Sequence, residues 1–162
     1  METERLHLIP LTAKQLKLWT ENRPALEKEL NCSYQAAPLE GLFLEIVKGQ
    51  TEKAASDEAN YRYHTFWFLV RKTDRMVVGA AGFKDVPDGN GEIEIGYGLG
   101  KRFEHNGYMT EAVKAMCGWA LEQKGIAHII AETDIDSPAS QNILKRCGFS
   151  LYKQEDTCWW RL

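Results

Sequence analysis

The sequence predicts a mixed α/β fold, of the α+β type, in which a mostly antiparallel central sheet of about six to seven strands has helices on both faces. Three strand-like segments follow one another at residues 65–71, 76–84 and 92–99, and the turn-forming stretches between them are typical of an antiparallel meander. A long helical pattern at 107–124 and a short, mostly apolar strand at 128–133 come next. Because that strand is reached through a helix, we expect it to run parallel to a neighbour.

The elements before the meander are expected to be one strand and several helices. Residues 5–10 alternate apolar side chains and end in a proline, which predicts a short strand. Helical spacing runs from 13 to about 30, and Pro24 should split this helix into two pieces. A further helix is expected over Leu39–Lys48, and the polar segment 49–60 is expected to be a mobile loop or a frayed helix end.

The C-terminal part is expected to add one helix and two strands. Ser137 can cap a helix whose first residue is Pro138, and Gly148 is suited to the position just after its end. The last two strands are expected near 149–154 and 157–162.

Length and composition indicate one domain over residues 1–162. A chain of 162 residues can bury a single core, and we find no repeat or linker. Its residues are 44% hydrophobic and 27% charged, and no apolar run approaches the ~20 residues that span a bilayer. The acidic N-terminus does not resemble a secretory leader, so we expect a cytoplasmic protein with no membrane partner.

Charge and cysteine usage exclude two classes of function. The net charge is −3 and the isoelectric point about 5.8, so the basic patch typical of a nucleic-acid-binding protein is missing, and a cationic or neutral ligand fits better. The four cysteines lack a CxxC pair and stand at no zinc-ligand spacing from a histidine. We therefore expect no metal and reduced thiols.

The most informative segment is the end of the strand 92–99 and the start of the helix near Gly107. A strand that ends in a glycine-rich kink and leads through a short loop to a helix N-terminus creates a site for anions, because free N–H groups meet the positive end of the helix dipole. Gly96, Gly98 and Gly100 do not complete a dinucleotide fingerprint, since Lys101 occupies the third glycine position. From spacing alone, a bulge and a tight turn remain the alternative interpretation.

Four stretches together resemble the GNAT family of N-acetyltransferases, in particular its branch similar to the ribosomal-protein alanine acetyltransferases (RimJ/RimL-like). They are residues 4–8 (Glu-Arg-Leu-His-Leu), 94–97 (Glu-Ile-Gly-Tyr), 102–107 (Arg-Phe-Glu-His-Asn-Gly) and 140–149 (Ser-Gln-Asn-Ile-Leu-Lys-Arg-Cys-Gly-Phe). They occur in the family's order over nearly the whole chain. The third corresponds to the family's pyrophosphate loop, R/Q-x-x-G-x-G/A, with His105 in place of the first glycine.

The resemblance implies an acetyl-coenzyme A-dependent N-acyltransferase that moves an acetyl group to a primary amine by direct attack in a ternary complex. Acetyl-CoA would be a cosubstrate, without a metal. The strands that hold Glu94 and Ile130 would splay apart, and the pantetheine arm would pair with the backbone around Tyr97 to Leu99. The N–H of Leu99 or of a neighbour would polarise the thioester carbonyl.

The residues expected to bind the cofactor are Tyr97, Gly98, Leu99, Arg102, His105, Asn106, Gly107, Tyr108, Met109, Thr110, Asn142 and Lys145. The pyrophosphate is assigned chiefly to backbone N–H groups from His105 to Thr110. For Asn142 and Lys145, a solvated position on the helix surface is the alternative interpretation.

A general base is needed because an alkylamine is almost wholly protonated at neutral pH. The candidates, in order of preference, are Glu94, Glu132 and Glu92. Strand alternation puts Glu92 and Glu94 on one face, whereas Glu132 is suggested by the family's catalytic glutamate. Each could instead be a solvated carboxylate on a strand face. Proton donors considered for the leaving thiolate are Tyr97, Tyr108 and Tyr152.

Two other classes of function are alternatives to an enzyme. A non-catalytic coenzyme-A-binding sensor or regulatory module could keep the cofactor cleft without turnover, and a nucleic-acid-binding domain is disfavoured by the charge. The acceptor could be a small molecule or a peptide N-terminus. Exposed edge strands would make a homodimer feasible.

Overall fold

The computed structural model describes all 162 residues. Its elements in chain order are β1 Leu6–Pro10, α1 Ala13–Glu21, α2 Arg23–Leu30, β2 Ser33–Tyr34, α3 Gly41–Ser56, the 3₁₀ helix Glu58–Tyr63, β3 Phe66–Arg71, β4 Met76–Phe83, β5 Glu92–Leu99, the 3₁₀ helix Lys101–Phe103, α4 Tyr108–Leu121, β6 His128–Asp134, α5 Pro138–Arg146, β7 Ser150–Gln154 and β8 Thr157–Arg161.

The strands form one mixed sheet in the order β1-β3-β4-β5-β6-β8-β7. All neighbours on this path are antiparallel except β5 and β6, which run parallel. The predicted fold class is therefore confirmed. An eighth strand, β2, pairs with the start of β4 and was not predicted, because two residues are too short to show an alternating pattern.

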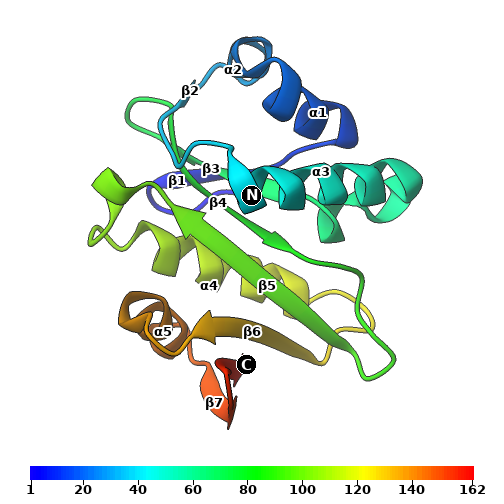
Figure 1. The fold of residues 1–162 in the computed structure, drawn as a ribbon, viewed down its shortest axis with the longest axis vertical. Helices are drawn as coiled ribbons and strands as arrows, with labels where there is room; N and C mark the ends of the chain where they lie inside the picture. Colours follow the sequence, from blue (N-terminus) through cyan, green and yellow to red (C-terminus); the bar gives the residue numbers. More distant parts are fainter.

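The helices cover the sheet on both faces, and Figure 1 shows α1 to α3 at one end of the molecule and α5 at the other, with the long β5 between them. Alternation along β5 directs Ile93 and Ile95 into the core cluster that packs under α4. A second cluster, which includes Trp19 and Phe68, lies under α1 to α3. The side chains of Glu92 and Glu94 therefore lie on the opposite face of β5, which is the face toward α3.

One helix prediction is corrected by the structure. The segment 49–60 is not a mobile loop, because α3 continues to Ser56 and a 3₁₀ helix follows. Its Ala54 is fully buried, and Gln50 Nε2 donates to the carbonyl of His64 at 2.7 Å. Packing and this hydrogen bond stabilise the second half of α3. Its polar sequence and Gly49 gave no helical pattern from which it could be predicted.

The two ends of α5 show one departure and one agreement. Pro138 is at the start as predicted, but the Ser137 side chain makes no capping hydrogen bond. At the other end Gly148 has a φ of 92°, and Phe149 N–H donates to the carbonyl of Leu144 at 3.0 Å, which is the expected glycine termination. Pro24 also splits the first helix as predicted, with Asn22 as the cap of α2.

No helix combines the length and the apolar character needed to cross a bilayer. No group of three or more His, Cys, Asp or Glu side chains lies close enough together to hold a metal ion.

Candidate active site at the splayed strands

The pairing of β5 with β6 stops partway along both strands. The register runs from Glu92 opposite His128 to Glu94 opposite Ile130. Beyond this point β5 continues to Leu99 paired only with β4, and β6 continues to Asp134 paired only with β8. The two parallel strands therefore diverge after Glu94, as the resemblance to the family implied.

The divergence leaves one edge of β5 without a strand partner. The Glu94 carbonyl accepts a hydrogen bond from the Lys84 N–H at 3.0 Å, and the Gly100 N–H donates to the Val78 carbonyl at 2.9 Å. The backbone N–H and C=O groups of successive residues point to opposite sides of a strand. Those of Glu94, Gly100 and the even-numbered residues between them therefore face β4, and those of the odd-numbered residues face the gap. The N–H of Leu99 is among the groups that face the gap. Such an edge can pair with an extended ligand that carries amide groups.

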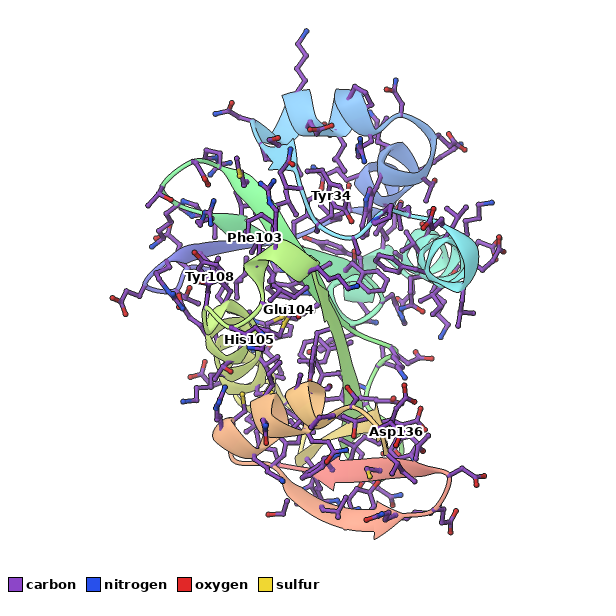
Figure 2. All side chains as sticks on the ribbon, turned by 60° about the vertical axis from the view of Figure 1, so that its left-hand side comes forward. Tyr34, Phe103, Glu104, His105, Tyr108 and Asp136 are labelled. Carbon is purple, nitrogen blue, oxygen red and sulfur yellow. The ribbon has the colours of Figure 1, made fainter.

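The loop from Gly100 to Gly107 (the 100–107 loop) brings the N-terminus of α4 to the end of this gap. Figure 2 shows Phe103, Glu104 and His105 on the path from β5 to α4, with Tyr108 at the start of the helix. Gly107 is the N-cap with a φ of 79°, and no side chain caps the helix. The first amides of α4 therefore lack partners within the helix and are free for an anion.

His105 adopts a left-handed backbone with a φ of 64°. Glycine reaches this conformation without steric cost, whereas other L-residues lose about 1–2 kcal/mol. The backbone geometry therefore explains why a glycine suits this position. His105 keeps that geometry and adds a side chain beside the gap.

Arg5 and Glu111 hold the 100–107 loop against the start of α4. Arg5 donates to the Glu111 carboxylate through its Nε and its backbone N–H, each at 2.8 Å, and through Nη1 to the carbonyl of Asn106 at 2.8 Å. Its guanidinium also lies over the Tyr108 ring, 4.5 Å from the centroid. Burial opposes ionisation of Glu111, but hydrogen bonds from Thr3 and Arg5 outweigh it and lower the pKa of this carboxyl.

These elements enclose a cleft of about 500 Å³, which we call the β5–β6 cleft. Its lining residues are Tyr97, Gly98, Leu99, Glu104, His105, Gly107, Tyr108, Met109, Thr110, Ser137, Ala139, Ser140, Asn142, Ile143 and Arg146. Most of the residues expected to bind the cofactor are thus brought together in one place.

Three of the expected cofactor residues lie outside the lining of this cleft. Arg102 places its guanidinium over the ring of Phe103, 4.7 Å from the centroid. Asn106 turns its side-chain amide back onto the loop and donates to the carbonyls of Phe103 and Glu104 at 3.0 Å. Lys145 lies over the Trp160 ring at 5.8 Å.

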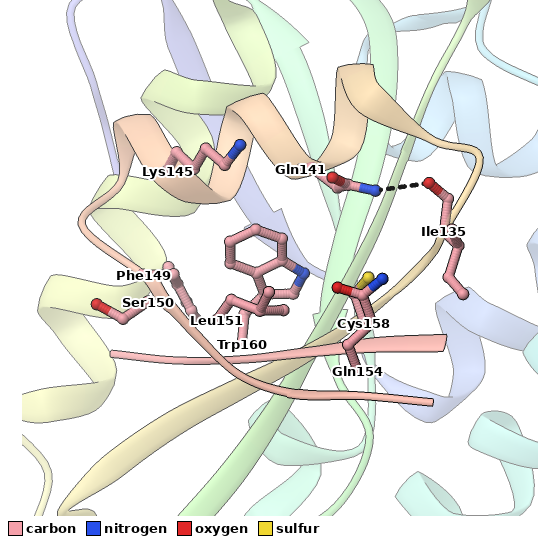
Figure 3. A pocket seen from close by; sticks show the side chains of 9 residues that line it. All are labelled: Ile135, Gln141, Lys145, Phe149, Ser150, Leu151, Gln154, Cys158 and Trp160. Carbon is pink, nitrogen blue, oxygen red and sulfur yellow. Dashed lines mark hydrogen bonds between the residues drawn. The ribbon is translucent and has the colours of Figure 1, made fainter. Parts of the chain in front are cut away.

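Lys145 belongs to a separate hollow between α5 and the last two strands. Figure 3 shows Lys145 above Trp160 there, with Gln141 bonded to the carbonyl of Ile135. The face of α5 that lines the β5–β6 cleft instead includes residues 139, 142, 143 and 146. This is the i, i+3, i+4, i+7 spacing of one helix face. Counted from Asn142, this spacing places Arg146 on the face of α5 that lines the cleft and Lys145 outside that face.

A second cavity, of about 660 Å³, lies on the α3 side of the sheet, and we call it the α3 cavity. Its lining residues are Tyr34, Ala36, Ala37, Phe43, Ile46, Gly49, Gln50, Lys53, Phe66, Ala80, Gly82, Phe83, Lys84, Gly96, Tyr97 and Gly98. Tyr97 and Gly98 also line the β5–β6 cleft, so both spaces border β5 at these two residues.

Small residues leave room for this cavity on the sheet. Ala80 pairs with Gly98 and Gly82 with Gly96 in the β4–β5 register. A Cβ placed on Gly98 would meet no atom within 4 Å. Gly96 and Gly98 therefore leave space beside the strand that a side chain would otherwise occupy.

None of the three candidate bases lines either space, but they differ in their partners. The Glu94 carboxylate contacts Lys84 Nζ, and Lys84 lines the α3 cavity. Glu92 accepts from Arg161 Nη2 at 2.6 Å, near the end of β8. Glu132 accepts from Thr157 Oγ1 at 3.1 Å. Of the three, Glu94 is thus linked to the cavity through a direct contact.

The three tyrosines considered as proton donors are also in different places. Tyr97 and Tyr108 line the β5–β6 cleft, while Tyr152 is exposed on β7. The Tyr97 hydroxyl lies 2.9 Å from Ser140 Oγ, so it joins β5 to α5 across the cleft. Burial raises the pKa of Tyr97 to about 12, against the smaller lowering by its hydrogen bond to Ser140.

The diverging parallel strands, the exposed backbone edge and the uncapped helix N-terminus give this α/β protein groups that suit an extended ligand with phosphate groups. The chain matches the family model of the acetyltransferase (GNAT) domain over residues 5–150. It therefore belongs to the GNAT acetyltransferase family.

Comparison with individual proteins gives the same result. The chain is 29% identical over 151 residues to an uncharacterised N-acetyltransferase of Bacillus subtilis, YjdG, covering 93% of this chain and 89% of that protein. The ribosomal-protein alanine acetyltransferase from Vibrio fischeri superposes with a TM-score of 0.69 at 14% identity, covering 100% and 94% of the two chains. The ribosomal-protein acetyltransferase RimL, solved in complex with coenzyme A, gives 0.69 at 13% identity over 99% and 94%. At such identities the superpositions show a shared fold, and the family supports acetyl transfer as the chemistry.

Proposed function

We propose that the protein transfers the acetyl group of acetyl-CoA to a primary amine by direct attack. The observation that carries this proposal is that the β5–β6 cleft and the α3 cavity share Tyr97 and Gly98 as lining residues. An extended thioester can enter from one side of β5 and an amine from the other, so the reacting atoms can meet without a covalent enzyme intermediate.

The β5–β6 cleft has the groups that acetyl-CoA needs. The free backbone edge of β5 suits the amides of the pantetheine arm, and the uncapped amides of α4 suit the pyrophosphate. Asn142 lines the same cleft and has an amide to offer the pantetheine. The N–H of Leu99, which faces the gap, would stabilise the oxyanion that develops on the thioester carbonyl.

The reaction requires one proton transfer before attack and a stable leaving group after it. The amine must lose its proton, and Glu94 is our candidate acceptor, acting beside Lys84 and through water. The amine nitrogen then bonds to the carbonyl carbon, the C–S bond breaks, and the electron pair leaves on sulfur. The nitrogen releases its second proton, which the thiolate or solvent takes up, so the products are the neutral amide and coenzyme A. Since a thiol has a pKa of about 8.5, its thiolate leaves readily. Tyr97, with a pKa of about 12, is a much weaker acid than that thiol.

The test is free-thiol release from acetyl-CoA in the presence of a panel of primary amines, with the N-acetyl product identified by mass spectrometry. We expect release that depends on the amine and one acetylated product for each thiol released. Tight binding of acetyl-CoA with no release on any amine would instead favour a non-catalytic coenzyme-A-binding module.

A further inference from the structure

The uncharged polar side chains that line the α3 cavity already have partners within the protein. The Tyr34 hydroxyl donates to the carbonyl of Ala37. Gln50 Nε2 donates to the carbonyl of His64 at 2.7 Å. The hydroxyl of Tyr97 is engaged in the β5–β6 cleft, as described above. The donor groups of these three side chains are therefore engaged within the protein, and a polar group of an acceptor could use one only by breaking an existing bond.

The two charged side chains that line the cavity are both cations, and both are paired. Lys53 Nζ lies 3.2 Å from the Asp85 carboxylate, and Lys84 Nζ contacts the Glu94 carboxylate. No aspartate or glutamate is among the lining residues. A second ammonium group on an acceptor would therefore meet two lysines and no free carboxylate.

The rest of the lining is apolar or lacks a side chain. Phe43 and Phe66 form one wall, with ring centroids 5.9 Å apart and nearly perpendicular planes. Ile46 stands on α3 at the opening and is 45% exposed. The floor is formed by the paired small residues of β4 and β5. Apolar surface of this kind gains free energy only when it covers apolar groups of the ligand.

We propose that the α3 cavity selects primary amines whose remaining body is apolar and uncharged, and that it discriminates against di- and polyamines. This inference rests on the proposed function, since it describes the acceptor side of the same reaction. The net charge of −3 alone indicates a cationic or neutral acceptor. The charges that line the cavity are the better guide, because salt screens the charges that lie farther from the acceptor. The reacting nitrogen would lie near Gly98 and the apolar body against the wall that Phe43 and Phe66 form.

Two amines of equal length test this selection. Hexylamine and cadaverine differ only in that a terminal methyl group is replaced by an ammonium. We expect kcat/KM for hexylamine to exceed that for cadaverine by about tenfold or more, because an unpaired charge is costly to bury. A cadaverine value equal to or above the hexylamine value would overturn the proposal.

A charge placed in the cavity should change the preference in a defined direction. Ile46→Glu puts a carboxylate at the opening, while Leu42→Glu adds the same charge one turn earlier on α3, at a residue that is 76% exposed and outside the lining. We expect Ile46→Glu to reduce or reverse the preference for hexylamine and Leu42→Glu to leave it unchanged. Equal effects of the two variants would contradict a role of the cavity.

Failure of the proposed function can be separated from failure of this inference. If neither amine is acetylated, the transferase proposal fails, and calorimetric titration of both amines into the protein, with and without coenzyme A, still decides the selectivity. A lower Kd for hexylamine than for cadaverine, with the hexylamine Kd raised in Ile46→Glu, would support the cavity as an apolar amine site. Equal or stronger binding of cadaverine would reject it.

Discussion

Arg5 and Glu111, which are 106 positions apart in the sequence, form an ion pair at 2.8 Å that holds the 100–107 loop in place. The Arg5 fork also donates to the carbonyl of Asn106, and its Nη2 would lie 3.3 Å from a Cβ on Gly107. One side chain thus connects the N-terminal segment, the loop and the first turn of α4. We propose that Arg5 positions the amides to which we assign the pyrophosphate.

Arg5→Ala should weaken acetyl-CoA binding, because the loop loses its anchor while the α3 cavity is untouched. We expect the KM for acetyl-CoA to rise roughly tenfold, with little change in the KM of the amine, and Arg5→Lys to restore only part of it. Arg62→Ala is the matched control, since Arg62 lies only beside the Tyr61 ring. A loss of thermal stability with an unchanged KM for acetyl-CoA would reduce Arg5 to a structural role.

The pH dependence of stability should reveal the same contact. Because its folded pKa lies below the ordinary value of 4.5, Glu111 contributes stability that is fully present above about pH 4.5 and is lost as pH falls through the lowered value. The unfolding free energy of the wild type should therefore exceed that of Glu111→Gln at neutral pH. The difference should shrink in acid. A gap that is constant with pH would show that the carboxylate charge is not involved.

Two glycines of the sheet should respond in opposite ways to alanine. A Cβ on Gly82 would lie 2.4 Å from the Thr65 carbonyl oxygen, whereas one on Gly98 meets nothing within 4 Å. Gly82→Ala should lower the unfolding free energy by roughly 1–3 kcal/mol, as overpacking does, and Gly98→Ala should not lower it. Denaturant unfolding of both variants makes the comparison, and similar losses would contradict the packing described at β4.

The choice of base can be tested by parallel substitutions of the three glutamates. If Glu94 accepts the amine proton, Glu94→Gln should lower kcat roughly a hundredfold, with most of the loss recovered at high pH where free amine is abundant. Acetyl-CoA affinity should stay unchanged. Glu92→Gln and Glu132→Gln serve as controls, because their carboxylates bond to Arg161 and Thr157 instead. An unaltered pH–rate profile in Glu94→Gln would move the role to another group or to solvent.

Much of the fold could be predicted because its signals are local. Alternation, turn residues and Pro24 are read from neighbouring positions, and they fixed the meander and the split helix. The continuation of α3 depends on the hydrogen bond between Gln50 and the His64 carbonyl, a partner outside the helix. No pattern within residues 49–56 could show it.

The two sides of the site differ in the same way. The β5–β6 cleft is built mainly from two continuous stretches, residues 97–110 and 137–146, so motif matching found most of it. The α3 cavity is lined from β2, α3, β3, β4 and β5, and its character depends on which partners Lys53 and Lys84 find. Those partners are set by packing between distant segments, which one sequence does not show.

The cofactor site itself can be tested most directly at Thr110, in the first turn of α4 and in the lining of the cleft. A carboxylate there is favoured by the helix dipole, so Thr110→Glu should fold, but it would repel the pyrophosphate. Thr110→Gln has nearly the same shape without the charge. In calorimetric titrations with acetyl-CoA, we expect the wild type and Thr110→Gln to bind with similar Kd and Thr110→Glu to lose on the order of tenfold or more. Equal affinity of the Glu and Gln variants, or no binding to the wild type, would contradict the assignment of this cleft to acetyl-CoA.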